Sequence, residues 1–128
     1  MKHTTLPIIF LLLLNACAFD VVRVKQTPAS IALQNDPSAN FILEKEAKVS
    51  LGTGYSRTLK ANTNWSLVGS LPEGDVFKTK DQILTVEGSN IYEAYIVIDS
   101  DNLTGFYLPA EGTYSPLKKP LPLYVIRQ

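Results

Sequence analysis

The chain's only cysteine, Cys17, lies in the stretch LLLLNACAFD, residues 11–20 of 128. A cysteine sulfur can attack a substrate, bind a metal, form a disulfide or carry a lipid. A lone cysteine in an exported chain has no internal disulfide partner. The residues that precede Cys17 therefore decide which of these chemistries we expect.

Residues 1–16 have the layout of a secretory signal peptide, with a basic start, a short apolar run and small residues at the end. Lys2 provides the basic start, and the apolar run extends from Leu6 to Leu14. A membrane-spanning helix needs roughly 20 apolar residues, about twice the length of this run. The pattern therefore predicts an export signal rather than a transmembrane helix.

The residues Leu14-Asn15-Ala16-Cys17 resemble the lipobox of bacterial lipoproteins, although Asn15 departs from its usual second residue. The resemblance implies that residues 1–16 are removed and that Cys17 is lipidated, as an acylated N-terminus held in the membrane. Several acyl chains together give a stable anchor. Ala18, where an aspartate would favour inner-membrane retention, implies export to the outer membrane with the domain facing the periplasm. An ordinary cleaved signal and a free or buried thiol are the alternatives.

Catalytic side chains are scarce in the mature chain. His3 is the only histidine and lies in the signal peptide, whereas Ser-His and Cys-His catalysis both need an imidazole to carry the proton. Most of the candidate carboxylates fall in expected turns, where acids bond the local backbone. These candidates are Asp75, Asp81, Glu93, Asp99, Asp101 and Glu111. We therefore predict no catalytic residues and no enzymatic activity.

Metal, cofactor and nucleic-acid sites also lack sequence support. A calcium loop starting at Asp99 would have Thr104 in place of its glycine and Ala110 in place of its last glutamate. The 12 basic and 12 acidic residues balance, which gives no electrostatic argument for nucleic acid. The pair Lys118-Lys119 is interpreted as solvated loop charge. We predict no metal, no cofactor and no nucleic-acid partner.

Aromatic side chains gather near the stretch GFYLP, residues 105–109. Exposed aromatic rings contribute strongly to protein interfaces, which makes Phe106, Tyr107 and Tyr114 candidate partner-binding residues. The alternative is that these rings fill the core of a small domain. Trp65 is expected in the core, with its indole N–H bonded nearby.

From residue 41 onward, short apolar runs alternate with turn residues such as those of 72–75, 87–90 and 99–102. The run 92–98 is the most apolar and is expected to be a central strand, and 123–127 an edge strand. The predicted strands cover residues 47–51, 55–61, 65–71, 76–79, 83–87, 92–98, 103–108 and 123–127.

This pattern predicts an all-β fold, a small antiparallel barrel or sandwich, because the strands are short and no helix is evident. The stretch NTNWSLVGSLPEGDVFKTKD, residues 62–81, resembles SH3-like bacterial modules. Residues 41–128 are the expected β domain. Residues 17–40, with Pro28 and Pro37, are the expected lipidated N-terminus and tether, part of which could instead lie on the domain.

The expected function is a non-catalytic accessory or structural component of an envelope assembly, such as a secretion or conjugation system. The protein would be anchored in the outer membrane and would contact an envelope protein through a sheet edge or an aromatic face. The alternative is a periplasmic binding or inhibitor lipoprotein that acts on an envelope enzyme or ligand. Its candidate loops are Gly52–Gly54 and Asp99–Asn102.

Overall fold

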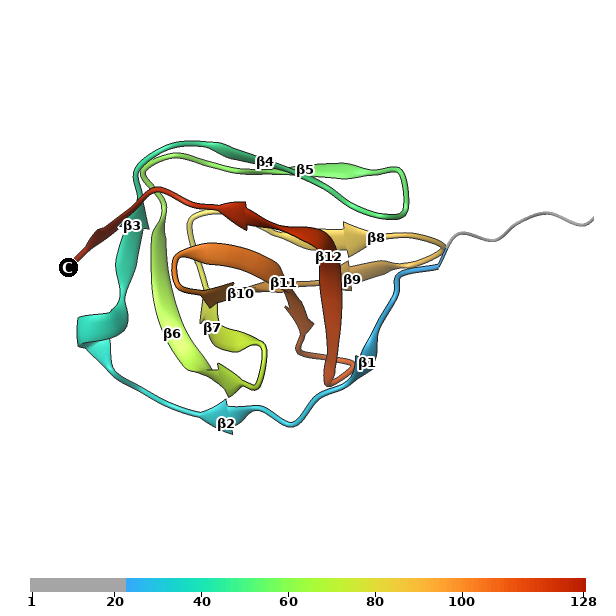
Figure 1. Cartoon of the computed structure of the whole chain (residues 1–128), viewed down its shortest axis with the longest axis horizontal. Helices are drawn as coiled ribbons and strands as arrows, with labels where there is room; N and C mark the ends of the chain where they lie inside the picture. Colours follow the sequence, from blue (N-terminus) through green and yellow to red (C-terminus); the bar gives the residue numbers. More distant parts are fainter. Residues whose placement is uncertain (1–22) are drawn as a thin grey trace, which may run out of the picture.

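A computed structural model describes residues 23–128, which form antiparallel strands around short turns (Figure 1). The only helical element in this part of the chain is one turn of 3-10 helix, η1 (Pro37–Ala39). The prediction of an all-β fold is confirmed. None of the described residues belongs to a helix long and apolar enough to cross a membrane.

The strands are short, as alternating runs between turn residues predict. They are β1 (Thr27–Pro28), β2 (Ala32–Leu33), β3 (Phe41–Leu43), β4 (Ala47–Ser50), β5 (Ser56–Leu59), β6 (Asn64–Leu71), β7 (Gly74–Lys78), β8 (Thr85–Glu87), β9 (Ile91–Glu93), β10 (Tyr95–Asp99), β11 (Asn102–Leu108), β12 (Thr113–Pro122) and β13 (Val125–Arg127).

One large sheet runs in the order β1-β12-β11-β10-β7-β6-β3-β13, and β2 also pairs with β6. The strands β4–β5 and β8–β9 form two separate hairpins. The strand β10 pairs with both β7 and β11, and β13 pairs only with β3. The predicted edge strand is therefore confirmed, and so is the central position of residues 95–98 in the predicted strand 92–98. The first part of that prediction was wrong, because the strand breaks at Ala94 and residues 91–93 form β9 in a separate hairpin.

Residues 27–33, which we call the clasp, border two distant strands of this sheet. Thr27 lies opposite Tyr114 on β12, and Ala32 lies opposite Ser70 on β6. Just before the clasp, the side chain of Val24 is buried in the core. The folded part therefore begins before residue 41, and the arrangement in which part of the expected tether lies on the domain is the one observed.

The core has two parts because the central strands are covered on both faces. Neighbouring residues of a strand point to opposite faces, so Ile96 and Ile98 enter the larger cluster while Val97 enters the smaller one. In the larger cluster, the ring of Phe41 stacks on Trp65 and meets Phe77 edge-on. Apolar packing on both faces is consistent with an all-β sandwich.

The longest strand, β12, was not predicted, because it contains three prolines. Its register with β11 jumps from the pair Gly105 and Pro116 to the pair Leu103 and Leu121. Proline is tolerated at such bulges because no ladder hydrogen bond is lost there. Lys118 and Lys119 lie in this bulged strand, so their interpretation as loop residues was wrong.

Candidate functional site

The predicted aromatic partner surface is not exposed. Phe106, Tyr107 and Tyr114 keep only 1%, 8% and 7% of their surface exposed. Phe106 belongs to the larger core cluster, and the two tyrosines belong to the smaller one. The prediction that these residues form a contact face is corrected by their burial, and the alternative core role is the observed one. Cys17, the predicted lipidation site, lies outside the described residues.

The polar groups of two buried rings, Tyr114 and Trp65, have local hydrogen-bond partners. The phenol of Tyr114 donates a hydrogen bond to Thr104 Oγ1 at 3.1 Å. Burial raises the pKa of Tyr114, the hydrogen bond with Thr104 opposes this, and the negative charge of Glu73 adds to the rise. The indole N–H of Trp65 donates to Thr63 Oγ1 at 2.8 Å, which confirms the predicted core role of this ring.

Two of the candidate carboxylates have structural partners. Asp81 accepts a hydrogen bond from the backbone N–H of Asn64 at 2.6 Å, and Asp101 forms an ion pair with Arg127. Residues 23–128 contain no cluster of three or more His, Cys, Asp or Glu side chains placed to bind a metal ion.

The two loops expected in the inhibitor alternative are tight. Ser100 and Asp101 have φ values of 50° and 62°, as the two central residues of a type I′ hairpin turn require. They join β10 directly to β11, so the predicted turn is confirmed. The loop at Gly52–Gly54 joins β4 to β5 and lines a surface feature that sequence analysis did not predict.

That feature is a pair of adjoining hollows, of about 180 and 680 Å³, between the β4–β5 hairpin and β12. Both are lined by Leu51, Gly52, Leu117 and Lys118. We call this surface the basic groove, because the residues of 23–128 that line it include Arg23, Lys25, Lys48, Lys118 and Lys119 but no aspartate or glutamate. These basic residues are far apart in the sequence, and only Lys118-Lys119 gave a local signal.

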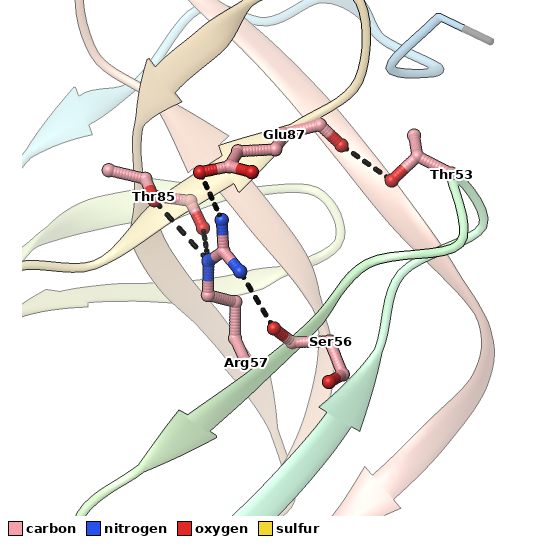
Figure 2. Close-up of polar contacts among 5 residues, drawn as sticks. All are labelled: Thr53, Ser56, Arg57, Thr85 and Glu87. Atoms are coloured by element: carbon pink, nitrogen blue, oxygen red, sulfur yellow. Dashed lines mark hydrogen bonds and ion pairs between the residues drawn. The ribbon is translucent and has the colours of Figure 1, made fainter.

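A polar network holds the β4–β5 hairpin that forms one wall of the groove (Figure 2). The guanidinium of Arg57 on β5 donates from Nε to the Thr85 carbonyl at 2.8 Å and from Nη1 to the Ser56 carbonyl at 2.7 Å. Its Nη2 lies 2.7 Å from a carboxylate oxygen of Glu87 on β8. The planar guanidinium therefore links the β4–β5 and β8–β9 hairpins through several donors at once.

The same network fixes the groove's loop. The hydroxyl of Thr53 donates to the backbone carbonyl of Glu87, which brings the loop at Gly52–Gly54 onto β8 (Figure 2). Since Arg57 pairs with the Glu87 carboxylate, the acidic group closest to this loop in the network is neutralised. The groove thus has a fixed wall, and its lining within residues 23–128 carries positive side chains and no negative ones.

A second candidate surface is the edge strand β13. The backbone N–H of Glu44 donates to the Tyr124 carbonyl, and the backbone N–H of Gln128 donates to the Asn40 carbonyl. Hydrogen bonding alternates along an antiparallel pair, so the even-numbered residues bond to β3 and the N–H and C=O groups of Val125 and Arg127 point away from it. Val125 and Arg127 have no backbone partner on that side among the described residues.

Apolar side chains accompany these unpaired backbone groups. Tyr124 and Ile126 are 57% and 49% exposed, and they lie on one face because side chains alternate along a strand. Arg127 also lines a hollow of about 480 Å³ together with Asp75 and Asp101. In Figure 1, β13 lies at one end of the long axis, and the chain enters the fold at the other end.

The chain matches no family model, no curated protein and no solved structure.

Proposed function

We propose that this protein is a lipid-anchored, non-catalytic component of a bacterial envelope assembly that binds a protein partner through the edge strand β13. The anchor is the acylated Cys17, and the membrane is the outer membrane, with the domain in the periplasm. The observation that carries the proposal is the open edge of β13, beside two exposed apolar side chains.

An open sheet edge is a template for another strand, because its unpaired N–H and C=O groups can continue the ladder. Val125 and Arg127 supply these groups, and Tyr124 and Ile126 supply apolar surface next to them. The occupant that fits this chemistry is an extended segment of a partner protein. Main-chain hydrogen bonds would provide affinity, and the exposed side chains would provide specificity.

The anchor supports an envelope location. Six peptide bonds separate Cys17 from Arg23, where the described fold begins. An acylated Cys17 would hold the domain close to the bilayer, and the partner edge at the far end of the molecule would face away from it (Figure 1).

The anchor is tested by replacing Cys17 with serine in the full chain. The wild-type protein should have the mass of a chain starting at Cys17 plus its acyl groups, and should fractionate with the outer membrane. Cys17→Ser should lose both properties. Ala18→Ser, which keeps the cysteine, is the matched control, and Ala18→Asp should shift the protein toward the inner membrane. An unchanged mass and fractionation in Cys17→Ser would refute the anchor.

The partner edge is tested with a photoreactive amino acid at position 126 in living cells. We expect a discrete crosslinked adduct from position 126 and none from position 91, the site of an exposed isoleucine on another strand, β9. Val125→Pro removes an outward N–H while leaving the bonds to β3 intact, and should abolish the adduct without unfolding the domain. Equal crosslinking at both positions, or an adduct that persists in Val125→Pro, would contradict the edge assignment.

A further inference from the structure

We propose that the basic groove is a membrane-docking face, which lies against anionic lipid headgroups of the bilayer that holds the anchor. This inference rests on the proposed acylation of Cys17, and it adds an orientation of the domain to that proposal. The ligand is the phosphate-bearing surface of the membrane itself.

The charge distribution favours an anionic surface. Among residues 23–128, five basic side chains and no acidic one line the groove, although the chain as a whole has a formal net charge of zero. The two ion pairs formed within residues 23–128 involve Arg57 and Arg127, neither of which is in the groove. The groove cations are therefore free of ion pairs in the described part of the chain.

The kind of cation favours a diffuse surface over a single bound anion. Four of the five are lysines, which act as flexible, hydrated point charges, whereas a specific phosphate site commonly uses the two-pronged arginine fork. Lys25, Lys48, Lys118 and Lys119 are all exposed at the rim. Between them lie the partly exposed apolar side chains of Leu117 and Leu121, a mixture suited to the interface of a bilayer.

The position of the groove on the chain places it next to the anchor. Arg23 and Lys25 line it, and Val24 between them is buried in the core. The chain is therefore held to the fold at the groove itself. At about 3.4 Å per extended residue, the segment from Cys17 to Arg23 spans at most roughly 20 Å. With so short a connection, the groove is the part of the domain closest to the headgroups.

The experiment uses the full-length lipoprotein, purified with its acylated Cys17 and reconstituted into vesicles. A fluorophore is attached at Ser50→Cys, an exposed position in the groove, or at Ile126→Cys, at the far end. Quenching by nitroxide-labelled headgroups reports how closely each position approaches the lipid. The vesicles contain either phosphatidylcholine alone or phosphatidylcholine with one third phosphatidylglycerol.

We expect several-fold stronger quenching at position 50 than at position 126 in the anionic vesicles. The difference should shrink in neutral vesicles, and also in 1 M salt, where the screening length falls to about 3 Å. The variant Lys25→Gln/Lys118→Gln/Lys119→Gln should lose the preference for anionic lipid. The charge-matched control Lys60→Gln/Lys78→Gln/Lys80→Gln, at exposed lysines outside the groove, should keep it.

Failure of the anchor and failure of the docking face give different results. A protein without acyl mass that does not float with the vesicles refutes the proposed anchor. A protein that is acylated and floats, but shows equal quenching at positions 50 and 126 or no dependence on lipid charge, refutes the docking face alone.

Discussion

The buried indole of Trp65 depends on one threonine. Thr63 is 4% exposed; its hydroxyl accepts from the Trp65 N–H and donates to the Lys60 carbonyl at 2.7 Å. Without this arrangement, the indole N–H and the threonine hydroxyl would be buried with no hydrogen-bond partner. The free-energy cost of such an unpaired polar group exceeds the net gain from an ordinary hydrogen bond. The two hydrogen bonds that link Trp65 to Thr63 and Thr63 to Lys60 thus let a large ring enter the core.

Replacing Thr63 with valine should destabilise the domain, because the indole N–H loses its acceptor while the volume is kept. The expected loss is about 1–3 kcal/mol in the free energy of unfolding, measured by urea denaturation with tryptophan fluorescence. Thr63→Ser keeps the hydroxyl and is the control. Equal losses in the two variants would show that packing of the methyl group, not the hydrogen bond, sets the cost.

Tyr114 makes the free energy of unfolding depend on pH in the alkaline range. Its pKa in the folded state is raised above the ordinary value of 10.0, chiefly by burial. Below that value both the folded and the unfolded phenol are neutral and the stabilisation is complete. As the pH rises from 10.0 through the folded pKa, the unfolded state releases its proton first, so the free energy of unfolding falls.

Tyr114→Phe should therefore weaken the loss of stability between pH 8 and pH 11, although it is less stable at pH 8 because the bond to Thr104 is gone. Urea denaturation across this range measures the effect. Tyr124→Phe, at an exposed ring, is the control. The same pH dependence in wild type and Tyr114→Phe would refute the assignment.

At the residue scale, sequence patterns predicted the core position of Trp65, but they left Tyr107 and Tyr114 open between a contact face and the core. A tryptophan in an alternating strand indicates a core position whichever strand pairs with it. The tyrosines are buried because the clasp covers the second face of the sheet, where the side chains of Ala29 and Ile31 pack against the cluster that contains both tyrosines. That contact joins residues at opposite ends of the described chain and leaves no local signal.

At the element scale, the crossing of the clasp over β6 requires a glycine. A Cβ atom at Gly69 would lie 2.5 Å from the Ala32 carbonyl oxygen and 2.8 Å from a side-chain carbon of Ile31. The backbone of the clasp would have to move away from β6. The bonds between β2 and β6 therefore depend on a residue that contributes no side chain.

Gly69→Ala should lower the free energy of unfolding by about 1–3 kcal/mol, the usual cost of overpacking, and should speed hydrogen exchange at the Gln34 amide, which bonds to the Val68 carbonyl. Gly52→Ala is the matched control, since a Cβ atom there meets nothing within 4 Å. If both variants exchange at the wild-type rate, the crossing is not tight.

Turn residues and alternation predicted most of the strands, the central position of residues 95–98 and the edge position of residues 125–127. The hairpin between β4 and β5 and the turn at Ser100-Asp101 depend on local backbone preferences, which can be predicted from the residue types at the turns. Strand β12 was missed because proline normally excludes a strand from the middle of a sheet. Only the tertiary arrangement, in which β1 pairs with just the first residues of β12 and the segment between Pro116 and Leu121 bulges, makes Pro116 and Pro120 acceptable.

At the scale of the whole molecule, the net charge of zero gave no indication of the basic side chains that gather at the groove. Equal numbers of acids and bases suggested no electrostatic partner, but folding collects residues 23–25, 48 and 118–119 at one surface. Whether these basic residues meet depends on which strands are neighbours in the sheet. The order of the strands cannot be derived from the positions of single lysines in the sequence. The basic groove was therefore beyond sequence-based prediction.

Val24 is the first residue of the described chain whose side chain is buried in the core. Val24→Ser should destabilise the domain by about 1–3 kcal/mol, because a buried apolar side chain is removed from the core, and the urea midpoint measures it. Arg23→Ser, at an exposed neighbour, is the control and should leave the midpoint unchanged. A wild-type midpoint in Val24→Ser would mean that this side chain does not hold residues 23–25 to the fold.

The clasp also sets the order in which the protein can acquire its shape. Gln26 and Thr113, which share a hydrogen bond, are 87 positions apart, and the strand opposite Thr27 is among the last to be synthesised. Contacts between such distant residues form slowly, because the intervening loop must close first. If the chain is exported from its N-terminus, as the proposed function implies, the clasp crosses the membrane before its partner strands, and the fold can close only after nearly the whole polypeptide has crossed.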